Sequence, residues 1–411
     1  MDLLTIITLL IVLSSAFGYI NVRFLKLPVT IGLMVLAIIF SVIMLIVNYF
    51  NPQVFQFAEA VVEQINFSKV LLDVMLSFLL FAGALHTDGS LLKAESRNIL
   101  MFSVVGVLIS TFIIATLLYY AIKLTGFDLD YIYCLLFGSL ISPTDPIAVL
   151  GILTKANVPK KIEINIVGES LFNDGVGVVI FTIILQVIRI GIENISVAEV
   201  AMLFVQEAIG GVIFGFVAGW CAYRLLKSID NYETEVMITI ALVMGGYYLA
   251  TMMHLSGPLA IVVAGLFFGN KAKDNTLSVT SRLYIYKFWE LIDVIMNAVL
   301  FVLIGLRLMV LDFSYNALIT GLFAIPIVLF ARYVSLKIPL FIAGKKSGIE
   351  SKQALLLVWG GLRGGLSIAM ALSLSGEESK DFIVFITYIV VLFSILVQGL
   401  TVGGFAKRLY K

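Results

Sequence analysis

The apolar residues of this chain are gathered into long runs that are separated by short segments holding most of the charged residues. Apolar residues make up 61% of the sequence and charged residues 13%, whereas soluble domains have roughly 45–50% and about 25%. A soluble core could not absorb this much apolar sequence, because a large part of any folded surface must face water. The sequence therefore predicts an all-α polytopic membrane protein.

Thirteen of these runs approach the length of about 20 residues that a helix needs to cross a membrane. The first run lacks the basic leading region of a signal peptide and is followed by Arg23 and Lys26, so we interpret it as a retained span. The ninth is short for a full crossing. The predicted spans are residues 3–20, 28–50, 67–86, 98–122, 130–153, 162–190, 198–226, 234–253, 256–270, 284–311, 316–343, 352–375 and 381–406.

The basic residues predict how these spans are oriented. If the N-terminus lies outside, most of the 27 Lys and Arg residues fall in alternate loops on the cytoplasmic side, as the positive-inside rule requires. The C-terminus then also lies in the cytoplasm. The net charge of +1 gives no indication of nucleic-acid binding. Cys134 and Cys221 both fall in predicted spans, so no disulfide framework is indicated.

The sixth predicted span carries a polar stripe within its apolar sequence. Its members lie at positions i, i+1, i+4 and i+5 of a helix and therefore share one face. They are Glu169, Ser170, Asn173 and Asp174. Ionisable groups within a membrane are costly and usually mark an ion or proton pathway, so this stripe is the candidate functional site.

Two other spans contain sequences that break helices. The fifth holds Ser142-Pro143-Thr144-Asp145-Pro146, and its prolines remove backbone donors and free carbonyl groups. The twelfth holds a glycine-rich segment around one arginine, residues 360–365. Within a membrane such breaks are tolerated only where they face the interior of a helical bundle or a cavity, because their free backbone groups need partners there. If the seventh span is a linker, each break falls in the fifth span of a six-span half, which predicts inverted six-helix repeats, two broken crossing helices and a midplane site.

Together these motifs resemble those of the NhaP-type monovalent cation:proton antiporters, a family related to the animal sodium/proton exchangers. The resemblance rests on both breaks, on the segment 168–175, and on Arg332 in Phe330-Ala331-Arg332-Tyr333. It implies an NhaA/NhaP-like antiporter fold, a homodimer, and a core that moves against a scaffold in an elevator-like motion. It also implies a multi-pass protein of the cell inner membrane.

The resemblance further implies how the chain is divided. Residues 1–92 and 231–312 would form the scaffold and dimerisation domain. Residues 93–192 and 313–411 would form the core ion-transport domain, and residues 193–230 the linker helix between the two halves.

Asp174 is the candidate group that binds either Na⁺ or H⁺. Burial favours the protonated form of a carboxyl group, so a proton and a cation can compete for it. A hard cation takes oxygen ligands, which Asp174, the Ser170 hydroxyl and the main-chain oxygen of Thr144 could supply, with water completing the shell. Asp145, at the break, would bind through water or offset the positive ends of the half-helices.

Glu169 needs a different role, because two unpaired carboxylates would bind too much positive charge. The resemblance implies a buried ion pair between Glu169 and Arg332, helped by Asn173, with Arg363 as a further partner. The site then carries one negative charge, which one proton or one cation neutralises. We therefore predict an electroneutral Na⁺(Li⁺)/H⁺ antiporter that needs no cofactor.

Several alternatives remain open from the sequence. A K⁺/H⁺ antiporter or a sodium-coupled organic-acid symporter would keep the same fold, and a passive channel is another possibility. Enzymatic activity is not predicted, because the chain lacks the His-Glu-x-x-His motif and a paired-aspartate protease signature. Four further acidic residues are interpreted as lining a funnel or an interface, and two histidines as residues at loop edges: Asp73, Glu207, Glu290, Asp293, His86 and His254.

Overall fold

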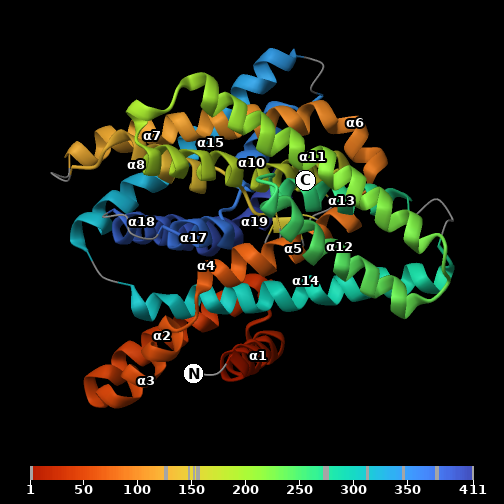
Figure 1. Ribbon diagram of the computed structural model, residues 1–411. Coiled ribbons are helices and arrows are strands. Elements are labelled where there is room, and N and C mark those ends of the chain that lie inside the picture. Colours follow the sequence, from red (N-terminus) through yellow and green to blue (C-terminus); the bar gives the residue numbers. More distant parts are fainter. Residues whose placement is uncertain are drawn as a thin grey trace.

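The computed structural model of the protein describes residues 3–124, 128–146, 149–150, 153, 158–271, 277–311, 314–344, 348–374 and 379–409. Within these residues the backbone is helical apart from loops and one isolated bridge between two extended residues. The predicted all-α fold is therefore confirmed. The α-helices, shown in Figure 1, are α1 (Leu3–Ile20), α2 (Val29–Phe50), α3 (Pro52–Glu63), α4 (Phe67–Lys69), α5 (Leu76–His86), α6 (Gly89–Leu100), α7 (Val107–Leu124), α8 (Tyr131–Ile141), α10 (Lys160–Ile190), α11 (Val197–Leu226), α12 (Tyr232–Met252), α13 (Gly257–Lys271), α14 (Val279–Arg307), α15 (Tyr315–Ala343), α16 (Ser351–Trp359), α17 (Gly365–Leu372), α18 (Lys380–Phe393) and α19 (Gly399–Leu409).

Several of these helices join end to end through wider π-helical turns. The π segments are η1 (Asn21–Leu25) after α1, η2 (Val70–Met75) between α4 and α5, η3 (Met101–Gly106) between α6 and α7, and η8 (Ser394–Gln398) between α18 and α19. Short 3₁₀ turns, η4 (Ile192–Asn194) and η6 (Leu308–Val310), follow α10 and α14. None of these turns was predicted, because the hydropathy of a helix does not report its winding.

The positions of the helices agree with the predicted spans. Ten continuous helical stretches of the described chain are long and apolar enough to cross a membrane. The eighth, ninth and tenth predicted spans correspond to α12, α13 and α14, of which α13 is one of the shorter apolar helices. The fifth span begins with α8, and the twelfth comprises α16 and α17; residues 147–148, 151–152 and 375 of these two spans lie outside the described part. The count of thirteen crossings stays a prediction.

Two helical segments differ from the predicted boundaries. The helix α3 lies between the second and third predicted spans and begins with Pro52 at its first position, where the missing amide hydrogen costs nothing. The fourth span begins at Gly89 rather than at residue 98, because the Asp88 carboxylate accepts hydrogen bonds from the amides of Ser90 and Leu91. Hydropathy reports only the apolar part of such a helix.

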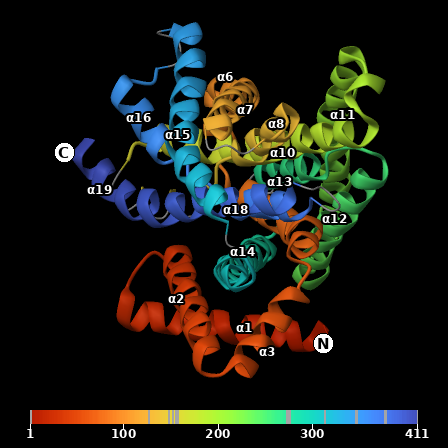
Figure 2. The same ribbon diagram turned by 90° about the vertical axis from the view of Figure 1, so that its left-hand side faces the viewer.

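The helices pack in two groups around the long helix α14. One group comprises α1, α2, α5, α12 and α13, and the helices α2 and α5 pack directly on α14. In the other, α7 packs on α8 and α15, α15 on α18, and α10 on α8. Figure 2 shows α14 nearly end on, with α1, α2 and α3 on one side of it and α15, α7 and α10 on the other. The predicted scaffold and core helices thus pack mainly within their own groups.

The helix α11, predicted to link the two halves, packs closely on α13. Glycines at four-residue spacing on α11 face α13, and a Cβ at Gly215 would come within 2.2 Å of the Ala260 carbonyl oxygen. Small residues at this spacing allow two helix backbones to approach in a membrane. The glycines that make this contact are Gly211, Gly215 and Gly219.

Candidate functional site

The two broken helices meet at the centre of the bundle. The helix α8 ends at Ile141, two residues before Pro143, and α16 ends at Trp359 before the glycine-rich segment. The extended residues between the half-helices pair in an antiparallel bridge, in which the amide of Asp145 donates to the carbonyl of Leu362 at 2.7 Å. The two breaks that the sequence places in matching spans therefore lie against each other.

Arg363 binds the carbonyl groups that the first break leaves unpaired. Its guanidinium donates to the carbonyl oxygens of Ser142 and Pro143, the second at 2.9 Å, and the residue is only 2% exposed. Its backbone amide donates to the Ser394 hydroxyl at 2.8 Å. The expected pairing of Arg363 with Glu169 stays a prediction: Glu169 is an electrostatic neighbour of Arg363, while the guanidinium hydrogen bonds in the described residues go to the break. Prolines at the break leave carbonyls without helical donors, and buried carbonyls require a partner.

Glycines allow the close approach of the crossing segments. A Cβ at Gly364 would lie 2.3 Å from a carboxylate oxygen of Asp145, and a Cβ at Gly177 would lie 2.2 Å from the ring of Pro143. Any larger residue at either position would therefore push the break away from its neighbour. The glycine-rich motif serves to bring two backbones together, as the sequence suggested.

The polar stripe of α10 faces the first break. The Ser170 hydroxyl donates to the main-chain oxygen of Thr144, so these two predicted ligands are in direct contact. The Asn173 amide donates to the Thr144 hydroxyl at 2.9 Å and accepts from its backbone amide at 3.3 Å. Asn173 was expected to help the Glu169–Arg332 pair, and its hydrogen bonds in the described residues go to Thr144 instead, because an amide can satisfy both the donor and the acceptor that Thr144 presents.

Glu169 and Arg332 form a buried pair behind this stripe. Both guanidinium nitrogens Nη1 and Nη2 donate to the carboxylate, the second at 2.9 Å, and Nη2 also donates to the carbonyl of Leu357. Glu169 is 1% and Arg332 6% exposed. A bidentate ion pair of this kind, with two hydrogen bonds between charged groups, is strong and directional. Gly361 lies against the guanidinium, where a Cβ would come within 2.8 Å of its Nε atom.

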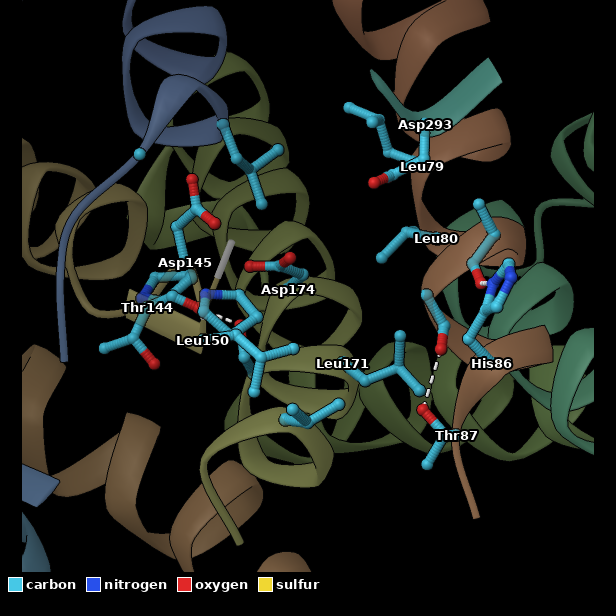
Figure 3. A pocket seen from close by; sticks show the side chains of 18 of the residues that line it. Leu79, Leu80, His86, Thr87, Thr144, Asp145, Leu150, Leu171, Asp174 and Asp293 are labelled. Atoms are coloured by element: carbon cyan, nitrogen blue, oxygen red, sulfur yellow. Dashed lines mark hydrogen bonds between the residues drawn. The ribbon is translucent and has the colours of Figure 1, made fainter. Parts of the chain in front are cut away.

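Asp174 and Asp145 both line the main cavity. Figure 3 shows the two carboxylates close together, Asp174 on α10 and Asp145 on the break, with Thr144 beside them. Both side chains are partly buried, and Asp145 is an electrostatic neighbour of Asp174. Asp174 therefore meets the cavity beside the Ser170 and Thr144 oxygens.

The cavity has a volume of about 550 Å³ and separates α10 and the break from α5 and α14. Its far end is lined by residues that the predicted orientation places near the cytoplasm, at the junction of α5 and α6 and at the start of α10: His86, Asp88, Leu91, Lys160 and Glu163. Glu290 and Asp293 on α14 line it too, as expected of funnel residues. The other two acidic candidates, Asp73 and Glu207, do not line it, and His254 lies in the turn after α12.

One polar residue that lies near this cavity was not singled out from the sequence. Asn297 on α14 is 4% exposed and donates to the Asp293 carboxylate at 3.1 Å. It stands four residues after Asp293 in an apolar helix. That spacing is a signal in the sequence, but which face of α14 meets the cavity is decided by packing.

Two broken helices that cross beside a carboxylate in the middle of a helical bundle define a class of protein, the membrane transporters with a central substrate site. The sequence profile of the transmembrane sodium/hydrogen exchangers matches residues 11–408. The chain therefore belongs to the sodium/hydrogen exchanger family, as its motifs suggested.

Individual relatives agree with this assignment. The chain is 46% identical over 413 aligned positions to the Na(+)/H(+) antiporter NhaP of Pseudomonas aeruginosa, covering 99% of this chain and 97% of that protein. It is 34% identical to the Na(+)/H(+) antiporter NhaH of Halobacillus dabanensis, covering 84% of each. The structure of the sodium proton antiporter MjNhaP1 from Methanocaldococcus jannaschii at pH 8 superposes with a TM-score of 0.78 at 22% identity, covering 100% of this chain and 99% of that one. This last likeness supports the same fold.

Proposed function

We propose that this protein is an electroneutral Na⁺(Li⁺)/H⁺ antiporter in which Asp174 binds either the cation or the proton. The observation that carries the proposal is the convergence of three oxygen donors where the cavity meets the crossing: the Asp174 carboxylate, the Ser170 hydroxyl and the Thr144 carbonyl. Its relatives named as Na⁺/H⁺ antiporters point to the same substrates.

The donor set suits a small hard cation. Carboxylate, hydroxyl and carbonyl oxygens are the ligands that such cations take. The Ser170 hydroxyl gives its proton to the Thr144 carbonyl, so the lone pairs of the hydroxyl oxygen are available to a cation. Water from the cavity completes the shell. Because Asp174 loses its proton to bind the cation, the apparent affinity for Na⁺ falls as the pH is lowered.

The charges around the crossing favour an exchange of one cation for one proton. Glu169 and Arg332 neutralise each other, and the positive Arg363 lies at the same break as the negative Asp145. With all these groups ionised, Asp174 supplies one unbalanced negative charge. One proton or one monovalent cation cancels it, so each half of the cycle moves a neutral site.

The position of the cavity suggests how the cycle proceeds. The cavity leads from Asp174 to the residues at the α5–α6 junction, so with the N-terminus outside this conformation is open to the cytoplasm. The core of α7, α8, α10, α15, α17 and α18 would move past the scaffold to open the other side. A homodimer in the cell inner membrane, joined through the scaffold, would hold the scaffold in place.

Transport in everted membrane vesicles tests the proposal. Na⁺ or Li⁺ added to vesicles acidified by respiration should release protons, seen as dequenching of a pH-sensitive dye, and Asp174→Asn should abolish the signal. A larger response to K⁺ than to Na⁺ would favour a K⁺/H⁺ antiporter instead. Equal dequenching by wild type and Asp174→Asn would refute the site.

Proteoliposomes test the charge balance separately. Purified protein should exchange Na⁺ for H⁺ without creating a membrane potential, and clamping the potential with K⁺ and valinomycin should leave the rate unchanged. A potential generated by Na⁺ flux alone would refute the one-for-one exchange and leave the antiport itself intact.

A further inference from the structure

The wall of the cavity opposite Asp174 is formed partly by one face of α14. Glu290, Asp293 and Leu300 all line the cavity, and at a period of 3.6 residues Asn297 falls on the same face between the last two. Figure 3 shows Asp293 across the cavity from Asp174, on the scaffold side. A cation that enters by the junction of α5 and α6 therefore passes this face before it reaches the crossing.

Asp293 and Asn297 form a joined pair of oxygen donors on this face. The Asn297 amide nitrogen donates to the main-chain oxygen of Asp293 at 2.8 Å and to its carboxylate at 3.1 Å. These bonds fix the amide, and its oxygen has no hydrogen-bond partner among the described residues although Asn297 is only 4% exposed. A buried amide oxygen normally has a partner. This unpaired oxygen lies about one helical turn from the Asp293 carboxylate, because Asn297 follows Asp293 by four residues in α14.

The neighbouring charges leave Asp293 without a tight cationic partner in the described residues. Lys287 pairs instead with Glu290, at 2.6 Å, and both of those side chains are more than half exposed. His86 is an electrostatic neighbour of Asp293, but its Nδ1 atom is bonded to the carbonyl of Ala82 at 2.7 Å and its ring packs edge-on against Tyr286. Among the acidic residues of α14 that line the cavity, Asp293 is thus the one without an ion pair.

We propose that Asp293 and Asn297 form a second, transient binding site for the transported monovalent cation on the scaffold wall. This proposal rests on the proposed function of Asp174. A carboxylate oxygen and a neutral amide oxygen hold a partly hydrated cation with few protein ligands, so the site releases it readily. The site stays with the scaffold when the core moves, and it supplies cations to Asp174 only while the cavity is open on this side.

Transport kinetics at pH 8 test the site. Asp293→Asn keeps the shape of the side chain and removes its charge, and it should raise the KM for Na⁺ entering from this side about three- to tenfold, with kcat within about twofold of wild type. Asn297→Leu should shift KM in the same direction. The matched control is Glu290→Gln, which removes the same charge three residues earlier and should leave KM within about twofold.

A binding measurement separates a site from a general electrostatic effect. The excess line width of the ²³Na NMR signal, recorded at pH 8 with purified protein in detergent, should persist in Asp174→Asn and fall when Asp293→Asn is added to it. An unchanged line width in the double variant would overturn the proposal, as would equal KM shifts for Asp293→Asn and Glu290→Gln.

The outcomes distinguish this proposal from the function on which it rests. If wild type exchanges Na⁺ for H⁺, Asp174→Asn does not, and Asp293→Asn behaves as wild type, the second site is refuted and the antiporter stands. If wild type itself moves no Na⁺, both proposals fail. A variant counts as folded if its size-exclusion profile matches that of wild type. If Asp293→Asn fails this criterion, the KM of Asn297→Leu tests the second site in its place.

Discussion

At the scale of single residues, the Ser170 hydroxyl is expected to act both as a hydrogen-bond donor and as a cation ligand. It donates to the Thr144 carbonyl and presents its own oxygen beside Asp174. Ser170→Ala should therefore raise the KM for Na⁺ about three- to tenfold, because one neutral oxygen ligand is lost, while proton binding by Asp174 is retained. The control is Ser139→Ala, since the Ser139 hydroxyl is fully buried and, within the described part of the chain, donates to the Leu136 carbonyl of its own helix. Equal KM values for the two variants would exclude Ser170 as a ligand.

Also at the scale of single residues, the Glu169–Arg332 pair is expected to stabilise the folded protein. Removing one partner of a buried ion pair typically costs about 3–5 kcal/mol, because the other charge is left uncompensated. Glu169→Gln and Arg332→Gln should each lower the thermal unfolding temperature in detergent, and the double variant should be no less stable than either single one. Additive losses in the double variant would show that the two side chains act independently.

How much of the site could be predicted is also decided at this scale. Asp174, Ser170 and Glu169 stand out because polar residues are costly in an apolar span, and at helical spacing they mark one functional face. The partners of Asn173 and Arg363 could not be predicted, because Asn173 binds the backbone amide and the hydroxyl of Thr144 and Arg363 binds two carbonyls, and only the folded break brings these groups to them. A sequence pattern reports which side chains are polar, whereas the groups that they bind depend on where each helix unwinds.

At the scale of elements, the crossing of the two breaks depends on a missing side chain. Gly364→Ala would place a Cβ 2.3 Å from an Asp145 oxygen and 2.6 Å from its Cβ, so the two extended segments must separate. We expect this variant to lose transport and to unfold at a lower temperature. The matched control is Gly245→Ala in α12, where a Cβ meets nothing within 4 Å and the alanine favours the helix by roughly 0.5–1 kcal/mol. Normal transport by Gly364→Ala would show that the segments do not need to touch.

The positions of the helices were largely predictable from the sequence, but the places where an α-helix widens into a π-helical turn were not. Long apolar runs specify helices across a membrane because the backbone must satisfy its own hydrogen bonds there, and prolines specify where one of them stops. The π segments carry no such mark. One of them, η2, has its Leu72 carbonyl bonded by the Tyr247 hydroxyl of α12 at 2.7 Å, a contact between residues far apart in the sequence. Tertiary packing of this kind decides where a helix widens.

At the scale of the whole molecule, the side of the membrane that the cavity faces can be measured directly. Leu79 lines the cavity on α5, and Asn194 lies in the turn after α10 that the orientation places outside. In a background without Cys134 and Cys221, Leu79→Cys should react with a membrane-impermeant maleimide only from the cytoplasmic face, and Asn194→Cys only from the outer face. Vesicles of both orientations supply the measurement.

The same labelling experiment tests the motion of the core against the scaffold. If the cavity closes when the core moves, conditions that favour the other conformation should slow the reaction of Leu79→Cys and leave that of Asn194→Cys unchanged, because the turn stays in water throughout. A rigid channel would leave both rates constant under every gradient of Na⁺ and pH. Reaction of Leu79→Cys from the outer face, with Asn194→Cys reacting from the cytoplasm, would instead reverse the orientation that the basic residues predict, and with it the direction in which the cavity delivers its cation.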